Sequence, residues 1–187
     1  MRKKIIISNK NVKLNTSRIG GASRLPKNIQ FPLTTLEQEQ KADVSLKFLF
    51  SISLTDLGFI QNRYKDYVCS VFFALDIKDY EHISIMQDYY KNEYIGSVVI
   101  IHKDEDYNRE DAFFEPPKQI IVEESKNEWL QDEIKWEGYS CFLEIDLLQI
   151  DEHSNMEGFF DDSYGYLFIK DDWKINENCG AFLLQST

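Results

Sequence analysis

The chain has 187 residues, of which 43% are hydrophobic and 14% aromatic, a composition that excludes a disordered tail and supports a globular core. A chain of this length can bury about 70% of its unfolded surface in one domain. Its net charge of −11 disfavours nucleic acid and anionic membrane as partners and favours a basic partner.

The first half of the chain predicts short strands separated by breaks. β-Branched and apolar residues at 5–7 and 12–14 indicate strands, and Gly20-Gly21 then breaks the chain. Residues 46–54 alternate apolar and polar side chains like a buried strand, although Leu49 interrupts the alternation. Strands are also predicted at 67–77, 96–102, 119–122, 166–169 and 181–184.

Two segments carry the apolar spacing of amphipathic helices. Residues 79–92 place Ile83, Met86 and Tyr89 three positions apart, and residues 127–136 are rich in large apolar side chains. Strands and helices do not alternate regularly along the chain, so a parallel doubly wound sheet is excluded.

The sequence contains an internal repeat. Residues 48–54 align without a gap with residues 141–147, at an offset of 93 residues. A second apolar run follows each copy, at 69–74 and at 164–169, offset by 95 residues. Solenoid units are only about 20–50 residues long, so this period fits two related halves that share one core.

These elements predict one α+β domain over residues 1–187, with a largely antiparallel sheet built from two interlocked repeats and few short helices. Repeat one covers about 44–101 and repeat two about 137–187. The N-terminal arm, 1–36, holds eight basic side chains and no acid, whereas the remainder holds 13 basic and 32 acidic side chains. The arm lacks the dense basic run of a binding tail, so we expect it to pack across the acidic body.

Several segments resemble the YwqG-like bacterial proteins, a family of unknown function. Residues 17–26, followed by Phe31-Pro32, resemble the Gly-Gly-x-Pro-x-Leu-Pro…Trp-Pro opening of that family. Residues 46–57 are similar to its Leu-x-Phe-Leu-x-Gln-Ile-x-Leu-x-x-Leu segment. Residues 162–169 look like its Gly-Asp-x-Gly-x-Leu-x-Phe-Phe-Ile strand, and residues 182–187 are similar to its terminal Phe-x-Leu-Gln-Cys-x.

The resemblance covers residues 17–187 in the order of the family, with some departures. Ser23 replaces a family proline, Phe31 replaces a tryptophan, and the Gly-Tyr-Pro motif before the second repeat is missing. The resemblance implies an α+β fold of two interlocked repeats and supplies no catalytic residues.

One acidic segment has the spacing of a calcium-binding loop. Oxygen-bearing side chains stand at positions 1, 3, 5 and 12 of such a loop: Asp104, Asp106, Asn108 and Glu115. The sixth position is Arg109, where the loop needs glycine, and a strand precedes the segment instead of a helix. We therefore interpret it as an acidic turn between two strands.

Histidines and cysteines show no metal-binding or catalytic spacing. The histidines are scattered, and we predict no metal, no cofactor and no catalytic residue. The cysteines lie in apolar runs without disulfide spacing, which predicts reduced thiols in a soluble, cytoplasmic protein. These residues are His82, His102, His153, Cys69, Cys141 and Cys179.

Aromatic residues between the repeats suggest a protein-binding surface. They are flanked by acids, and a tyrosine-rich, acid-rimmed surface suits a basic protein partner. We therefore predict a non-enzymatic binding protein, in one version an immunity protein that binds a basic toxin domain. The predicted contact residues are Tyr89, Tyr90, Tyr94, Phe113 and Phe114.

The alternative is a small-ligand sensor or an enzyme with a pocket between the two repeats. In that hypothesis the pocket brings together Arg18, Arg24, Asp162 and Tyr164. Nucleic-acid binding through the basic arm ranks third, and the sequence sets no oligomeric state.

Overall fold

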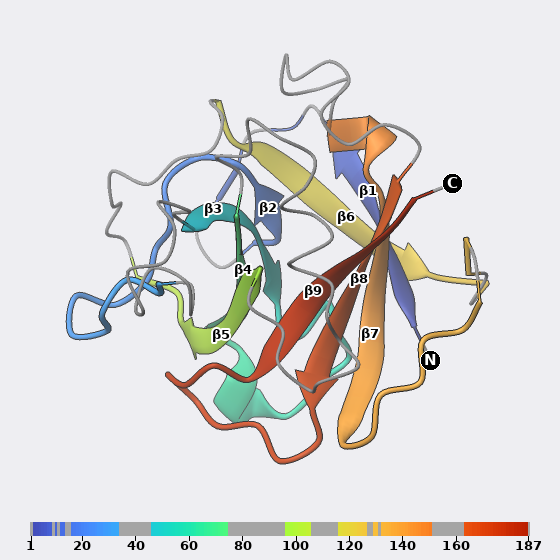
Figure 1. The fold of residues 1–187 in the computed structure, drawn as a ribbon. Helices are drawn as coiled ribbons and strands as arrows, with labels where there is room; N and C mark the ends of the chain where they lie inside the picture. The colour runs from blue at the N-terminus through green and yellow to red at the C-terminus, as the bar shows by residue number, and fades with distance from the viewer. Residues whose placement is uncertain are drawn as a thin grey trace.

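The computed structural model folds the chain mainly into strands (Figure 1). It describes residues 2–8, 10, 12–13, 16–33, 46–74, 96–105, 116–126, 129–130, 132–150 and 163–186. Within these residues the only helical elements are the 3-10 helix η1 (Asn62–Tyr64) and a helical turn at 148–150. The strands are β1 (Lys3–Ser8), β2 (Arg18–Ile19), β3 (Leu46–Ser53), β4 (Tyr67–Ala74), β5 (Ser97–Lys103), β6 (Lys118–Glu124), β7 (Tyr139–Asp146), β8 (Ser163–Lys170) and β9 (Gly180–Ser186).

All nine strands belong to one sheet, in the order β5-β4-β3-β2-β6-β1-β7-β8-β9. Neighbouring strands are antiparallel except β1 and β7, which are parallel. The sheet curls so far that its two edges meet. Just before β9, the Cys179 N–H donates to the Val99 carbonyl of β5 at 2.8 Å. The prediction of a largely antiparallel sheet with few helices is confirmed for the described residues.

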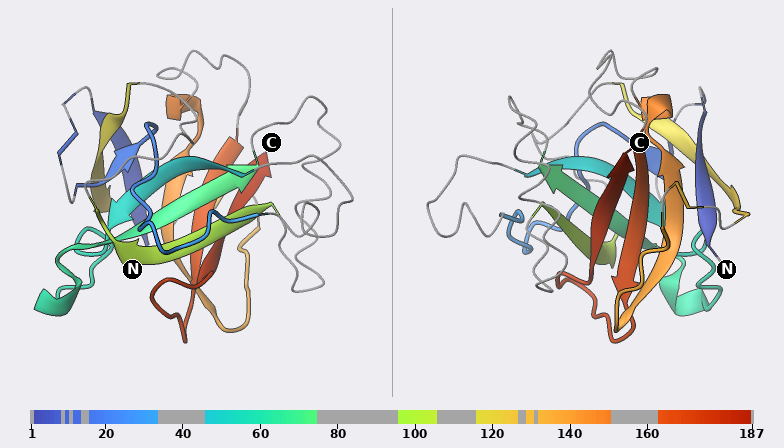
Figure 2. Two further views of the ribbon diagram at one scale, coloured as in Figure 1. Left: turned by 90° about the vertical axis from the view of Figure 1, so that its left-hand side faces the viewer. Right: turned by 45° about the vertical axis from the view of Figure 1, so that its right-hand side comes forward.

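The meanders β3-β4-β5 and β7-β8-β9 have the same pairing pattern. Pairing of β3 with β4 shifts between Phe48 and Phe50, and pairing of β7 with β8 shifts between Cys141 and Leu143. These irregularities lie 93 residues apart, at the offset found in the sequence, and the first one explains why Leu49 interrupts the alternation of β3. Figure 2 shows the meanders as two walls of the sheet, coloured teal to yellow-green and orange to red.

The inner sides of the two meanders share one core. Ile52 pairs with Cys69, and Ile145 pairs with Gly165 at the corresponding place in the second meander. Both isoleucines are fully buried in the same cluster. An added Cβ at Gly165 would lie 2.1 Å from the Phe182 ring, so the core packing requires glycine there.

The outer side of the second meander is covered by the segment that precedes β7. Trp129 lies 4.7 Å from the Tyr166 ring, and Trp136 stacks on Tyr139 at 4.0 Å. The Leu130 N–H donates to the Tyr166 hydroxyl at 2.9 Å. The helix predicted at 127–136 is therefore wrong for the described residues, because the chain is irregular there, with bends at 130 and 132, and packs its indole rings on the sheet.

Two further predictions concern short segments. Residues 12–13 are not in a strand, because the Thr16 hydroxyl donates to the Lys13 carbonyl at 2.6 Å and closes a turn. The helix predicted at 79–92 lies outside the described residues.

The N-terminal arm packs across the acidic body, as predicted. Its first strand, β1, lies inside the sheet between β6 and β7. Basic side chains of the arm form ion pairs with acids of the body: Arg2 with Glu144 at 2.7 Å, Lys3 with Glu124, Lys4 with Glu123 at 3.6 Å, and Arg24 with Asp104 at 3.4 Å.

Candidate functional site

Most of the residues predicted to form the partner surface or the pocket lie outside the described part of the chain. The five aromatic residues of the predicted partner surface lie outside the described part of the chain, as does one pocket candidate. These residues are Tyr89, Tyr90, Tyr94, Phe113, Phe114 and Asp162.

Arg18 and Arg24 serve the fold. The Arg18 guanidinium donates to the carbonyls of Gly20 and Ala22, at 2.9 Å each, and lies 4.6 Å from the Phe48 ring centre. The chain wraps around this guanidinium because Gly20 has a φ of 69°, a left-handed conformation that glycine adopts readily.

Arg24 pairs instead with Asp104, the first acid of the calcium-like spacing. The Asp104 carboxylate is buried, and Arg24 neutralises it from the preceding arm. No cluster of three His, Cys, Asp or Glu suited to a metal occurs among the described residues. Tyr164 lies on β8, across the sheet from β2, so the predicted meeting of Arg18 and Arg24 with Tyr164 is not found.

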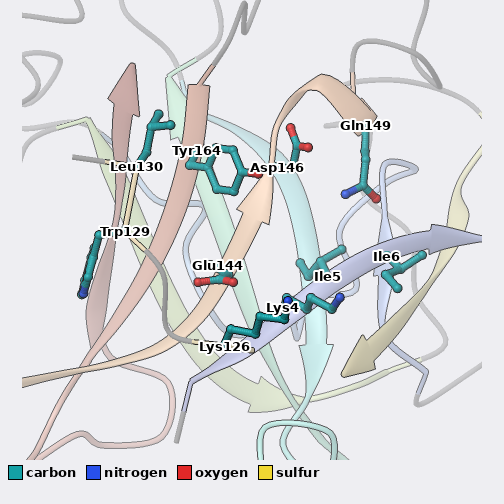
Figure 3. Close-up of a pocket in the computed structure, with 10 residues that line it drawn as sticks. All are labelled: Lys4, Ile5, Ile6, Lys126, Trp129, Leu130, Glu144, Asp146, Gln149 and Tyr164. Atoms are coloured by element: carbon teal, nitrogen blue, oxygen red, sulfur yellow. The ribbon is translucent and has the colours of Figure 1, made fainter. Parts of the chain in front are cut away.

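Tyr164 does line a pocket, on the outer side of the sheet over β1, β7 and β8 (Figure 3). The pocket has a volume of about 460 Å³, within the range of small-molecule sites. Its walls combine apolar side chains with charged groups of both signs. The lining residues are Lys4, Ile5, Ile6, Lys126, Trp129, Leu130, Glu144, Asp146, Gln149 and Tyr164.

A neutralised carboxylate forms the base of this pocket. Glu144 forms an ion pair with Arg2, whose Nε lies 2.7 Å from Oε2, and its Oε1 accepts from the Ser125 hydroxyl at 2.5 Å. Arg2 is itself buried, with its guanidinium carbon 4.2 Å from the Trp129 ring centre and 5.3 Å from that of Tyr166. Burial raises the pKa of the Tyr166 phenol, which therefore remains neutral beside the ion pair.

The mouth of the pocket carries charges that are weakly paired. Asp146 accepts one hydrogen bond, from the Leu148 N–H at 3.1 Å. Lys126 is exposed and makes no ion pair with any described residue. Lys4 forms only a surface pair with Glu123 at 3.6 Å.

A second groove lies at the corresponding end of the first meander. It has a volume of about 510 Å³, and β6 borders it where β1 borders the first pocket. Ser53 and Asp56 line it, 93 residues before Asp146 and Gln149. Of the two aspartates that line the groove, Asp56 is engaged by the Ser17 hydroxyl, which donates to it at 2.5 Å.

A cluster of aromatic rings lies where η1 meets the β8–β9 turn. Phe59 stacks on Phe142 at 5.5 Å and meets Trp173 edge-on at 5.7 Å. Tyr64 lies 5.7 Å from Trp173. Beside Phe59, the Ile60 side chain is 86% exposed, the largest exposure among the exposed large hydrophobic residues described. We call Phe59, Ile60, Tyr64, Phe142 and Trp173 the aromatic end.

A serine–histidine pair is sealed inside the first meander. The Ser70 Oγ and His102 Nε2 lie 2.8 Å apart, and His102 Nδ1 lies 2.8 Å from the Lys103 carbonyl. A carbonyl only accepts, so Nδ1 carries the proton and Nε2 accepts from Ser70. Both side chains are almost completely buried, which makes the pair a structural hydrogen bond.

Sequence reasoning missed both the pocket and the aromatic end. Their residues come from separate segments, and no single motif contains them. One signal was present in the repeat, because Glu144 and Asp146 replace Ser51 and Ser53 at the offset of 93 residues. That exchange marks the outer side of the second meander as chemically different.

No family model, no curated protein and no solved structure matches this chain.

Proposed function

We propose that the chain is a non-enzymatic binding protein that captures a basic protein partner through its aromatic end. An immunity protein that holds a basic toxin domain is one such role. The observation that carries the proposal is the exposed Ile60 beside the half-buried rings of Phe59, Tyr64 and Trp173. Aromatic anchors next to an exposed aliphatic side chain are typical of energetic centres in protein interfaces.

The charge of the protein supports a basic partner. The net charge is −11, and Arg2, Lys3, Lys4 and Arg24 are already held in ion pairs with the body. A strongly acidic surface accelerates encounter with a basic protein and repels nucleic acid. The thiols of the described cysteines are unpaired, which suits action in the cytoplasm.

The family and the repeat belong to the same proposal. In our proposal β3-β4-β5 and β7-β8-β9 descend from one duplicated unit and form the two interlocked repeats of a single α+β, YwqG-like domain. The support is their common strand order, their common bulge position and the shared core around Ile52 and Ile145.

The test is a capture experiment with three versions of the full chain. The wild type, Ile60→Asp and Leu33→Asp are immobilised and exposed to lysate of the native cell, and bound proteins are identified and then purified. Leu33 is the matched control because it is another exposed aliphatic residue, at 41%. We expect a basic protein that binds the wild type and Leu33→Asp equally and Ile60→Asp about tenfold or more weakly.

Two results would contradict the proposal. Equal binding of the purified partner to Ile60→Asp would remove the aromatic end from the interface. Recovery of acidic partners alone would remove the role of charge. Circular dichroism of the three proteins controls for folding, and an interface residue this exposed should leave the spectrum unchanged.

A further inference from the structure

We infer that the pocket over β1, β7 and β8 is a site for a small zwitterion with an α-amino acid head group. This ligand site is separate from the aromatic end and independent of the protein partner proposed above. The inference rests on the placement of opposite charges across one cavity of about 460 Å³.

The charges of the pocket lie on separate sides. In Figure 3 the ammonium groups of Lys4 and Lys126 lie at the lower side of the view, whereas Asp146 and Gln149 lie at the upper side. Among the described residues, neither lysine forms an ion pair with Asp146. The ammonium groups therefore lie apart from the Asp146 carboxylate, and the carboxylate drawn near them is that of Glu144.

The deeper carboxylate does not compete for the ligand. Glu144 pairs with the Arg2 guanidinium and accepts from the Ser125 hydroxyl, so its charge is balanced from beneath the pocket. The carboxylate left to meet a cation is that of Asp146, which accepts only from the Leu148 N–H within the described residues. A ligand ammonium at Asp146 would form a charge-assisted hydrogen bond in a partly desolvated place.

The lysines complete the recognition of a zwitterion. Lys126 makes no ion pair within the described part of the chain, and the pair of Lys4 with Glu123 is half exposed and weak. A ligand carboxylate at Lys126 would therefore displace no strong interaction. The walls from Trp129, Leu130 and Ile6 supply apolar surface for the rest of the ligand.

The experiment measures binding by calorimetry on the full chain. The probes are L-phenylalanine, L-glutamate and L-lysine, which share the head group and differ in side chain. For the tightest of them, the amide lacks the carboxylate and the N-acetyl derivative lacks the ammonium. We expect at least one amino acid to bind below about 10 mM, and both derivatives to bind about tenfold or more weakly.

Two pocket variants assign each charge to its partner. Asp146→Asn should weaken the amino acid about tenfold and abolish discrimination against the N-acetyl derivative. Lys126→Gln should weaken it similarly and abolish discrimination against the amide. The exposed residues Asp172 and Lys135 lie outside the pocket lining, so Asp172→Asn and Lys135→Gln serve as matched controls and should bind like the wild type.

Several outcomes would overturn the inference. The first is that none of the three amino acids binds at about 10 mM. The second is that the amide or the N-acetyl derivative binds as tightly as the amino acid itself. The third is that Asp146→Asn loses discrimination against the amide and Lys126→Gln loses discrimination against the N-acetyl derivative. Unfolding midpoints of all variants show whether each remains folded. Since Asp146 and Lys126 line the pocket and lie outside the aromatic end, partner capture and amino-acid binding can fail separately.

Discussion

The two meanders share a backbone plan and differ in what they place on their outer sides. Ser51 pairs with Ser70 in the first, and Glu144 pairs with Tyr166 at the corresponding place in the second. The inner sides keep aliphatic and aromatic residues that meet in one core. Strand pairing is therefore maintained by the shared interior, while the outer side is chemically variable.

The outer sides bury polar groups in two different ways. The first meander buries a neutral hydrogen-bonded pair, Ser70 and His102. In the groove beside this meander, the Ser17 hydroxyl donates to Asp56. The second buries an ion pair, Arg2 with Glu144, directly beneath an open pocket. A buried ion pair is costly to form and very costly to break on one side. The second meander thus depends more strongly on its polar groups.

The largest expected effect tests this dependence. Glu144→Ala should lower the free energy of unfolding by about 3–5 kcal/mol, because it removes the carboxylate that neutralises the buried Arg2 charge. Ser51→Ala, at the corresponding place in the first meander, removes no charge and should cost about 1 kcal/mol or less. Urea unfolding of both variants measures the difference. Equal losses of unfolding free energy in the two variants would show that the outer sides of the two meanders contribute equally to stability.

The second effect tests the shared interior. Gly165→Ala should destabilise the protein by about 1–3 kcal/mol, because the new methyl group would overlap the Phe182 ring. Phe182 packs at 5.3 Å against Phe50, so the ring cannot move without disturbing the first meander. Adding Phe182→Leu should recover part of the loss in urea unfolding. A fully additive double variant would contradict a clash between these two positions.

The third effect compares two hydroxyl groups at the same place in the two meanders. Ser70→Ala removes the donor to buried His102 and should cost about 1–3 kcal/mol. Tyr166→Phe removes an acceptor for the Leu130 N–H, on a segment that is partly solvated, and should cost about 1 kcal/mol. Thermal unfolding of both variants ranks them, and the reverse order would show that the His102 pair is dispensable.

The sequence predicted the strands well because their signals are local. Alternation and β-branched runs predicted five of the six meander strands, whereas β7 was indicated only by the alignment of 141–147 with 48–54, which placed Ile52 and Ile145 in equivalent positions. The helix at 127–136 failed because its apolar spacing serves tertiary contact: Trp129 and Trp136 pack on the second meander. Local periodicity does not distinguish a helix face from an irregular segment that covers a sheet.

The sites could not be predicted in the same way, because their residues meet only through topology. Lys4 and Asp146 share a pocket because β1 pairs in parallel with β7, although the paired residues Lys3 and Leu143 lie 140 positions apart in the sequence. The two arginines named as pocket candidates have structural partners instead. Arg18 donates to the carbonyls of Gly20 and Ala22, and Arg24 pairs with Asp104.

The smallest effect concerns the reactivity of the thiols. It distinguishes cysteines on the inner side of the sheet from the one on the outer side, and it involves no change of stability at neutral pH. Burial raises the pKa of Cys141 to about 11 and of Cys179 to about 12, and burial together with nearby Cys179 raises that of Cys69. Labelling by a thiol reagent at pH 8 should therefore be about 100-fold slower than for an exposed cysteine. Cys141, on the outer side, should react first, and Cys69, inside the core, last.

The same thiols predict how stability changes in alkali. Their pKa values are higher in the folded than in the unfolded protein, so folding favours the protonated form. Their contribution is complete below the unfolded value of about 8.5 and is lost as the pH rises toward about 12. Cys141→Ala should therefore flatten the loss of stability in that range. An unchanged pH profile, together with rapid labelling of Cys69 in the native protein, would contradict the burial of these thiols.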